Sequence, residues 1–542
     1  MSKLFERLVK KRGLTPDFLS PKYESLKDPF LLPDMKKAVA RIKKAIETNE
    51  KILIYGDYDV DGVTASTALA DSLKLAGIKA EDIEIMLPDR FADGYGMSPK
   101  LIPRAKKYGV KLVITVDCGS HNHEIIEELN GLGIDSIVTD HHEVGETLPE
   151  AIAVVNPKRR DFDDKDLRNL AGVGVAFKLA EALAKEGLIT SGQEKWLLDL
   201  VLIGTVCDNM PLTGENHILG FYGLKVLEKT RRPGLIELMR RAGVKSLNSE
   251  AIGFQIGPRL NAAGRLDTAE LSLNLLRATD GPTAAELAEK LENLNKKRKT
   301  EQVAATNEIK KRGVSDEPVI IETGNWHEGI LGIVAGRLVE EYEKPAFVLT
   351  ETKNGIYKGS GRSFGDFNLA EALEFAKDVI INGGGHAAAA GVKVEQKNFY
   401  AFREKINEYY RSLNLKDQTK YLKTQPDLEV ENLAELSLDF LEELKQLEPF
   451  GTGNEEPIFR LKNTEIYEIR KMGAEGQHLR LDMKDKNSRI LKLVAFFAPE
   501  TWLTLDPAYD KIEPIVKLTE NDFNGVKSVE ARLIDLSILN NS

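Results

Sequence analysis

Three aspartates at alternate positions stand near the start of the chain and could bind metal. They are Asp57, Asp59 and Asp61, directly after a run of apolar residues. In extended backbone, side chains two residues apart point the same way, so three carboxylates would crowd on one face. Carboxylates that close raise one another's pKa and oppose folding unless cations neutralise them. The spacing therefore predicts a metal-binding segment.

Two other kinds of acidic segment share this pattern. A calcium-binding EF-hand loop also opens with Asp-x-Asp-x-Asp-Gly, but it follows a helix and needs a glutamate at its twelfth position. That position, counted from Asp57, is Ala68, and the segment here follows a predicted strand. The EF-hand is therefore excluded, and an acidic surface turn stays open as the structural alternative.

Acidic residues and histidines also follow three other apolar segments. They are Asp117, the run Asp140-His141-His142-Glu143, and Asp208. Each alone is typical of a helix cap or a turn, but together they offer oxygen and imidazole ligands for two adjacent divalent cations. Such a pair lowers the pKa of a shared water and stabilises a pentavalent phosphoryl transition state. The predicted reaction is metal-assisted hydrolysis of a phosphoester.

The elements that must position these residues alternate between strand and helix. Apolar runs predict strands at 51–56, 83–87, 112–116, 134–139 and 151–155, with helices at 63–75, 101–108 and 123–132. This alternation predicts a parallel, doubly wound sheet. Ligands of such sheets bind at the carboxyl ends of the strands, which is where the acidic residues fall.

The remainder of the chain shows two more patterns. Residues 160–300 are mainly helical and lead into a long charged stretch at 285–312. A second α/β pattern follows, with strands at 318–322 and 345–349, a helix at 329–342 and a glycine-rich turn at 383–386. After a polar linker near 414–427 and a helix ending at 447, polar and apolar residues alternate at 478–483, 490–497 and 528–536. These last runs predict a small antiparallel, OB-like β-barrel.

Composition limits the class of protein. A chain of 542 residues should form several domains. It has neither an apolar run long enough to span a membrane nor a secretory signal, so we expect a cytoplasmic protein that does not bind membranes. The two cysteines, Cys118 and Cys207, exclude a disulfide framework and a zinc site of several thiolates. The net charge of −10 decides nothing, because a nucleic-acid enzyme needs only a local basic groove.

Motifs in a fixed order resemble those of a known family. Asp140-His-His is the signature of the DHH phosphoesterases, and four motifs resemble its RecJ branch: Asp57-Tyr-Asp-Val-Asp-Gly, Val116-Asp-Cys-Gly, Asp140-His-His-Glu and Cys207-Asp-Asn-Met. Further motifs of that branch begin at Gly257, Trp326, Gly359, Gly383 and Leu447. The likeness runs from about Asp28 to the C-terminus.

The resemblance implies an α/β fold with a parallel-sheet DHH domain and a second lobe. The expected parts are a DHH domain at 51–225, a helical connector at 226–312 with a long connecting helix, a smaller α/β DHH-associated domain at 313–412, a linker and helix at 413–456, and an OB-like barrel at 457–542. Residues 1–50 are expected to form an N-terminal extension packed on the DHH domain.

The resemblance also implies an activity and its residues. The activity is 5′-to-3′ degradation of single-stranded DNA with two Mn²⁺ or Mg²⁺ ions, by a monomer, in recombination and repair, alongside a single-strand-binding protein and a RecQ-type helicase. One ion would be held by Asp57, Asp59 and Asp117, and the other by Asp61, Asp117, His141 and Asp208. His142 would orient or protonate a group near the scissile phosphate, with Asp117 and Asp140 completing the catalytic set.

The same resemblance suggests residues that bind DNA. They are Arg259, Asn261 and Arg265 in the cleft, Ser360 and Arg362 at the terminal 5′ phosphate, His386 near the active site, and Arg90 in the loop after the second strand. Arginine suits this role because its fork donates two hydrogen bonds to a phosphate. The basic run at 296–299 is instead expected to be an ordinary solvated helix face.

Two other functions stay open at this point. One is another enzyme of the superfamily, such as a nanoRNase, a cyclic-dinucleotide phosphodiesterase or a family II pyrophosphatase; the predicted C-terminal barrel favours RecJ over these shorter proteins. The other is a non-catalytic partner of a replication helicase that only binds single strands. Retention of every carboxylate and imidazole that the metal site requires argues against a decayed site.

Overall fold

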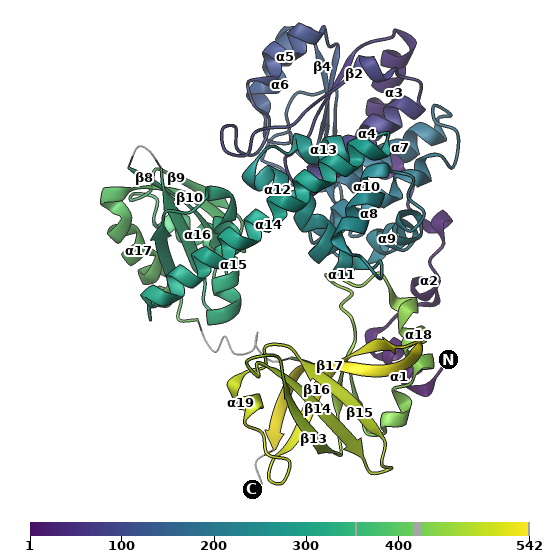
Figure 1. Ribbon diagram of the computed structural model, residues 1–542. Coiled ribbons are helices and arrows are strands. Elements are labelled where there is room, and N and C mark those ends of the chain that lie inside the picture. Colours follow the sequence, from purple (N-terminus) through teal and green to yellow (C-terminus); the bar gives the residue numbers. More distant parts are fainter. Residues whose placement is uncertain (353–354, 416–423, 540–542) are drawn as a thin grey trace. The chain divides into compact units, whose positions relative to one another are not determined.

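The computed structural model describes residues 1–352, 355–415 and 424–539 (Figure 1). Contacts divide the chain into two units. The first comprises Lys27–Met210 and Tyr222–Tyr421, and the second comprises Met1–Leu26, Pro211–Phe221 and Leu422–Ser542. Among the described residues, no helix is both long and apolar enough to cross a membrane.

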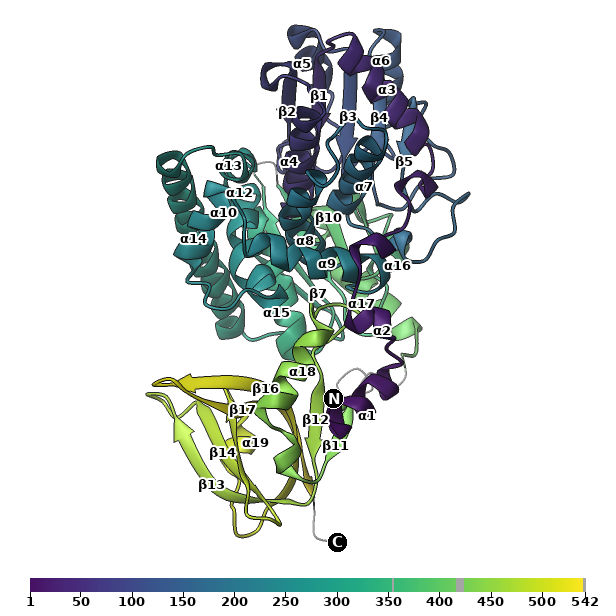
Figure 2. The ribbon, with the colours of Figure 1, turned by 90° about the vertical axis from the view of Figure 1, so that its right-hand side faces the viewer.

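A five-stranded parallel sheet begins the first unit. Its order is β2-β1-β3-β4-β5, visible side by side in Figure 2. The strands are β1 (Ile52–Tyr55), β2 (Ile83–Met86), β3 (Leu112–Val116), β4 (Asp135–Thr139) and β5 (Ala153–Val155). The helices around them are α3 (Met35–Glu47), α4 (Val60–Leu75), α5 (Leu101–Tyr108), α6 (His123–Gly131) and α7 (Gly172–Lys185). Helices α5 and α6 share one core cluster with Leu53 and Tyr55 of β1, while α4 contacts β1 and β3 and α7 contacts β3 and β4. Both faces are buried, as the unbroken apolar strands predict.

A helical segment links this sheet to a second one. Its helices are α8 (Leu198–Cys207), α9 (Gly214–Leu227), α10 (Pro233–Ala242), α11 (Ser249–Ala251), the π-helical turn η6 (Ile252–Ile256), α12 (Gly257–Leu266), α13 (Glu270–Leu276) and α14 (Gly281–Arg312). The last is the expected long charged helix. Asp280 caps it by accepting a hydrogen bond from the Thr283 backbone N–H, and it packs against α10, α12 and α13.

The second sheet has the order β6-β7-β8-β10-β9. Its strands are β6 (Ile320–Gly324), β7 (Ala346–Glu351), β8 (Ile356–Arg362), β9 (Asn382–Gly385) and β10 (Ala389–Glu395), and its helices are η7 (Glu328–Ile330), α15 (Leu331–Tyr342), α16 (Leu369–Phe375) and α17 (Phe399–Ser412). The glycine-rich segment expected as a turn is instead the edge strand β9, paired with β10. Glycine disfavours strands, so only the pairing reveals this one.

The second unit contains a seven-stranded sheet in the order β11-β12-β16-β17-β15-β14-β13. Its strands are β11 (Leu428–Val430), β12 (Ile458–Leu461), β13 (Thr464–Met472), β14 (His478–Asp485), β15 (Ile490–Ala495), β16 (Lys511–Phe523) and β17 (Val526–Leu539), with α18 (Leu438–Leu444) and α19 (Glu500–Leu503). The pairing is antiparallel except for β11 with β12 and β15 with β17. Strand β11 lies in the segment expected to be only linker and helix, so that boundary is corrected.

The prediction that all of residues 1–50 pack on the DHH domain is wrong for its first part. The N-terminal helices are α1 (Lys3–Arg12) and α2 (Pro16–Leu19). Leu4, Phe5 and Leu8 of α1 are buried in the core of the C-terminal sheet. An amphipathic helix shows in its sequence which face is apolar, but not which surface will cover that face. Helix α3 does pack on the parallel sheet, where Arg41 contacts Asp135 at 2.5 Å.

Candidate active site

The first acidic segment spans the turn from β1 into α4. Asp59 caps α4, because its side chain accepts a hydrogen bond from the Gly62 backbone N–H at 3.0 Å. Asp61 already lies in the first turn of the helix, so the expected geometry of three carboxylates on one extended face is wrong. Gly62 is needed for this tight turn, since a Cβ there would lie 2.6 Å from the backbone nitrogen of Asp57.

Asp61 is held by the N-terminus of α7. Its two oxygens accept hydrogen bonds from the backbone N–H groups of Gly172, at 2.6 Å, and Val173, at 2.9 Å. These N–H groups have no partner within their own helix and stabilise a negative charge. A Cβ at Gly172 would lie 2.7 Å from Asp117 Oδ1, so glycine at this position lets the helix end approach two carboxylates.

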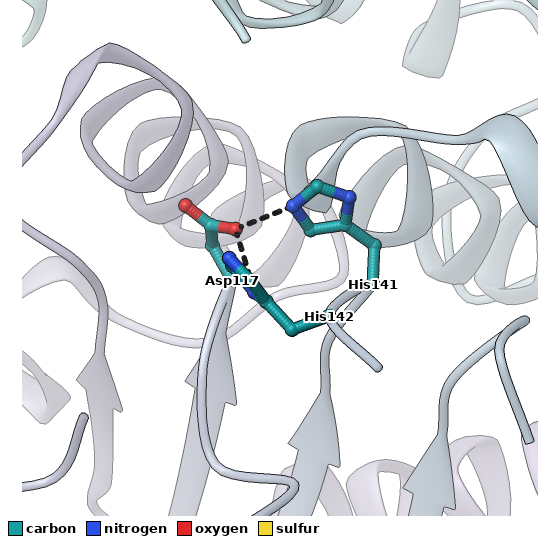
Figure 3. Close-up of side chains that lie close together, drawn as sticks. All are labelled: Asp117, His141 and His142. Atoms are coloured by element: carbon teal, nitrogen blue, oxygen red, sulfur yellow. Dashed lines mark ion pairs between the residues drawn. The ribbon is translucent and has the colours of Figure 1, made fainter. Parts of the chain in front are cut away.

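Asp117 meets two histidines at the carboxyl ends of β3 and β4 (Figure 3). It follows β3 with a φ of 60°, a conformation that residues other than glycine rarely adopt and that occurs at functional sites. Its Oδ1 lies 3.1 Å from His141 Nε2 and 3.8 Å from His142 Nδ1. The side chain is almost fully buried.

His141 presents an unprotonated nitrogen to the carboxylates. Burial, and then the charge of His142, lowers the pKa of His141 to about 3, and the ring hydrogen-bonds the backbone of Leu170. Its Nε2 is buried without a hydrogen-bond partner among the described residues, so the bond to Leu170 must use Nδ1. The free Nε2 lies 3.6 Å from oxygens of Asp61 and Asp208. A neutral ring oriented through its other nitrogen is the usual state of a metal-binding histidine.

Two groups of side chains could each hold one cation. The first ligand set is Asp57, Asp59 and Asp117, and the second ligand set is Asp61, His141 and Asp208. Within each set the ligand atoms lie within 4.8 Å of one another. Asp117 also forms such a group with His141 and His142, so it connects the two sets. These are the residues that the family resemblance suggested as ligands.

The electrostatics of these sets fit cation binding. Burial, and then the neighbouring carboxylates, raises the pKa of Asp61 to about 7 and that of Asp208 to about 8. The same causes raise the pKa of Asp57 and Asp117, and each has a buried Oδ1 without a hydrogen-bond partner in the described part of the chain. Buried carboxylates that repel one another are stabilised by positive charge. Carboxylates with one imidazole suit Mn²⁺ or Mg²⁺.

Without metal, Asp208 should make stability depend on pH. A carboxyl group with a raised pKa in the folded state favours folding only while protonated, so stability falls as pH rises from about 4 towards about 8. We expect Asp208→Asn to have a higher Tm than the unmodified protein in EDTA at pH 8, and a smaller difference at pH 5. Differential scanning fluorimetry measures this. Asp163→Asn, at an exposed position, is the control, and an unchanged or lower Tm for Asp208→Asn at pH 8 would contradict the expectation.

Asp140 positions His142 and does not join the ligand sets. Its Oδ1 accepts a hydrogen bond from His142 Nδ1 at 2.9 Å, and its Oδ2 accepts one from the Ser120 backbone at 3.0 Å. Burial raises the pKa of Asp140, but the hydrogen bond and charge of His142 outweigh this and bring it to about 2. Burial lowers the pKa of His142, but the hydrogen bond and charge of Asp140 raise it to about 9. His142 therefore carries a proton at neutral pH, and its Nε2 remains for a substrate.

Three arginines interact with one another beside the first ligand set, where Arg90 acts on Asp57 and Asp59 acts on Arg265. This arginine cluster consists of Arg90, Arg265 and Arg362. Burial, and then the charges of Arg90 and Arg362, lowers the pKa of Arg265 to about 9. Arg90 lies over the ring of Tyr58 at 4.9 Å, and Arg362 donates hydrogen bonds to Ser360 Oγ at 3.3 Å and the Gly361 carbonyl at 2.8 Å. Within the described ranges no member of the cluster forms an ion pair with a carboxylate, so the cluster attracts anions.

The other residues suggested for DNA binding have different surroundings. Arg259 is buried and forms an ion pair with Glu292 at 2.5 Å, so its guanidinium is neutralised inside the protein and does not fit the suggested role. Asn261 is half-buried on α12. His386 follows β9 and is exposed. After Lys158 and Arg168, its charge contributes to lowering the pKa of Glu143, which places it near the Asp140-His-His-Glu motif.

Two site residues escaped the sequence reasoning. Tyr95 is 49% exposed and its ring centroid lies 5.0 Å from that of His142. The backbone of Leu170 orients His141. Tyr95 lies in the same loop as Arg90, and no motif in the sequence marked it as a site residue. The backbone of Leu170 could not be found from sequence, because backbone groups do not depend on residue type.

Known proteins share all three parts of this architecture. Profiles match for the DHH family N-terminal domain at residues 51–205, the DHHA1 domain at 316–412 and the RecJ OB domain at 427–535. The chain is 34% identical to the single-stranded-DNA-specific exonuclease RecJ of Dickeya dadantii (strain 3937), over 97% of this chain and 94% of that protein. The chain belongs to the RecJ family. It is also 35% identical to the RecJ of Bacillus subtilis (strain 168), over 96% of this chain but only 65% of that longer protein.

Solved RecJ structures agree with this membership. The crystal structure of RecJ in complex with Mn²⁺ from Thermus thermophilus matches with a TM-score of 0.82 at 30% identity, over 98% of this chain and 75% of that one. The Mg²⁺ complex from the same organism matches with a TM-score of 0.78 at 27% identity, over 98% of this chain and 74% of that one. The predicted fold class, a parallel-sheet DHH domain with a DHH-associated domain and an OB domain, is confirmed.

Proposed function

We propose that this chain is a single-strand-specific DNA exonuclease that removes nucleotides in the 5′-to-3′ direction with two Mn²⁺ or Mg²⁺ ions, in recombination and repair. One observation carries the proposal: acidic groups from three separate segments meet with His141, from a fourth, in two ligand sets joined by Asp117. RecJ relatives are named as single-stranded-DNA-specific exonucleases, and two solved relatives are Mn²⁺ and Mg²⁺ complexes.

The residues of the site would have different roles in phosphodiester hydrolysis. Bound cations would supply a nucleophile at neutral pH and positive charge for the phosphoryl oxygens. Asp117 sets the spacing of the two ligand sets. His142, protonated at neutral pH and oriented by Asp140, would donate a hydrogen bond or a proton to the phosphate or its leaving oxygen. Asp140 acts through His142, so it is a positioning residue.

The arginine cluster supports the proposed 5′-to-3′ direction. Ser360 and Arg362 end β8 in direct contact with each other, and Gly332 of α15 leaves room there, since a Cβ would lie 2.9 Å from Arg362 Nη2. A terminal phosphate carries more charge than an internal one, so an arginine without a carboxylate partner favours it. Ser360 and Arg362 would therefore bind the 5′ phosphate and set the polarity.

Arg362→Ala should reduce the preference for 5′-phosphorylated ends by roughly 10- to 100-fold, the loss of a charged hydrogen bond. Rates on strands with 5′-phosphate and 5′-hydroxyl ends measure this. Arg337→Ala on the exposed side of α15 is the control, and should leave the preference unchanged. Equal rates on both ends for the unmodified protein would remove the role assigned to Arg362.

End-labelled DNA tests the function as a whole. Single- and double-stranded substrates, labelled at either end, are incubated with and without Mn²⁺. We expect mononucleotide release from the 5′ end of single strands only, and only with metal. Faster hydrolysis of pNpN dinucleotides or pyrophosphate than of long strands would instead favour the short-substrate enzymes of the superfamily.

The partners proposed from the family likeness are a single-strand-binding protein and a RecQ-type helicase, acting with a monomer in the cytoplasm. A helicase would expose the 5′ strand, and a binding protein would keep it unpaired. The rate of strand degradation is measured with each purified partner and with an unrelated basic protein as the control. Each partner should raise the rate, and the control protein should not.

A further inference from the structure

The buried stripe of the long helix α14 changes from apolar to polar at its middle. Its inward positions are spaced by four and three residues, the period of one helix face. They are the buried Ala284, Ala288, Leu291, Asn295, Arg298, Ala305 and Ile309, with the half-buried Gln302 among them. An ordinary packed helix would keep apolar residues along the whole stripe. The three central polar positions therefore need an explanation other than packing.

Arg298 is a buried cation without a counter-ion. Arg298 is only 8% exposed, and its Nε is buried without a hydrogen-bond partner in the described part of the chain. Asn295 Oδ1 accepts a hydrogen bond from Nη2 at 2.9 Å, and Gln302 Oε1 accepts one from Nη1 at 3.4 Å. Both partners are neutral amides, which orient the guanidinium and leave its charge uncompensated.

Neither of the nearest acidic residues of α14 pairs with Arg298. Glu292 pairs with Arg259 at 2.5 Å, and Glu301 Oε1 lies 3.9 Å from Lys297 Nζ while its Oε2 is buried without a hydrogen-bond partner in the described part of the chain. Arg298 forms no ion pair with any carboxylate of the described residues. The positive charge of Arg298 also lowers the pKa of Arg265, a member of the arginine cluster. Its effect is smaller than those of burial, Arg90 and Arg362. Arg298 is thus a further arginine without an ion pair whose charge interacts with the arginine cluster.

A buried guanidinium without an anion costs stability, and the two amides beside it are arranged to hold it, not to neutralise it. We infer that Arg298, oriented by Asn295 and Gln302, is a second phosphate-binding position that holds the backbone of the DNA strand beyond the nucleotide being removed. The contact would be independent of base sequence, because it is made to phosphate. This inference rests on the proposed function, since it needs a strand that runs past the metal site.

Arg298→Met tests it, because methionine removes the charge and keeps an unbranched apolar stem. Lys299→Met, the same charge change at the next, exposed position, is the matched control. Binding of a fluorescent oligodeoxythymidine strand is measured in EDTA by anisotropy over a range of salt. Arg298→Met should raise Kd by roughly 5- to 20-fold at low salt and reduce the salt slope by about 1, as for loss of one phosphate contact. Lys299→Met should change Kd by less than about twofold.

Two further measurements separate binding from structure. Arg298→Met should raise KM for long strands and leave both kcat and the hydrolysis of pNpN dinucleotides unchanged, because a dinucleotide has no further backbone phosphate beyond its second nucleotide. Its Tm without DNA should be unchanged or higher, since an uncompensated buried charge is gone. Unchanged strand binding would overturn the inference, and so would a Tm lowered by several degrees, which would assign Arg298 to helix packing. If the unmodified protein itself fails to bind or degrade single strands, the proposed function is contradicted, and so is this inference, which rests on it.

Discussion

Asp117→Asn should abolish hydrolysis of single-stranded DNA while leaving the protein folded. Asp117 belongs to the first ligand set and also forms a group with His141 and His142, so its loss weakens both cation positions at once. We expect a fall in rate of more than roughly a thousandfold, which corresponds to about 4 kcal/mol of lost transition-state stabilisation. The rate is measured on a labelled single strand with saturating Mn²⁺.

The same substitution should stabilise the protein when metal is removed. Burial and the neighbouring carboxylates raise the pKa of Asp117, so its ionised form opposes folding at neutral pH. In EDTA at pH 8, Asp117→Asn should therefore have a higher Tm than the unmodified protein. Addition of Mn²⁺ should raise the Tm of the unmodified protein by more than it raises the Tm of Asp117→Asn. Asp163→Asn should change neither rate nor Tm. Near-normal hydrolysis by Asp117→Asn with Mn²⁺ would contradict the two-cation assignment.

His142→Ala should lower the rate by roughly 10²- to 10⁴-fold, the range for loss of a general acid or base. Its ring is held by Asp140 at 2.9 Å and lies against Tyr95, so it is positioned before substrate binds. The fold should be unaffected, because the side chain is partly exposed. His123→Ala, at a histidine outside the ligand sets, is the control and should keep its activity.

The pH dependence distinguishes the roles of His142 and Asp140. Asp140 raises the pKa of His142 to about 9 against the effect of burial, so His142 should lose its proton, and the enzyme its activity, on the alkaline side. In Asp140→Asn the pKa of His142 falls, and the alkaline limb of kcat/KM should move to lower pH. His142→Ala should show no such limb. Identical limbs in all three proteins would remove His142 as the titrating group.

The secondary structure of the parallel sheet was predictable from sequence almost residue by residue. Strands β1, β3 and β4 coincide with apolar, β-branched runs, and α5 begins and ends at the expected residues. These signals are local, because side-chain periodicity depends only on neighbours along the chain. Outside this sheet, strands β8 to β13 and β16 were not predicted. Two of them show why: β9 is mostly glycine, and β11 is only three residues long. Their strand character comes from pairing with distant residues.

The identity of the metal-site residues was likewise present in the sequence, because carboxylates after successive parallel strands must gather at one edge of the sheet. Their division into two ligand sets was suggested only by the family resemblance, because it depends on contacts across the fold. Asp61 is drawn to the N-terminus of α7, more than a hundred residues away in the chain, and the tautomer of His141 is set by the backbone of Leu170.

Sequence by itself determined the residue types and the local periodicity, and with them the fold class and the chemistry. Only the tertiary structure decided which charges are paired and which are left free. The sequence suggested DNA binding for Arg259 and a solvated helix face for the run that holds Arg298. Both arginines are buried instead; Glu292 neutralises the first, and two amides surround the second. The physical reason is that electrostatic pairing depends on distances between residues across the fold. The periodicity of the sequence does not give those distances.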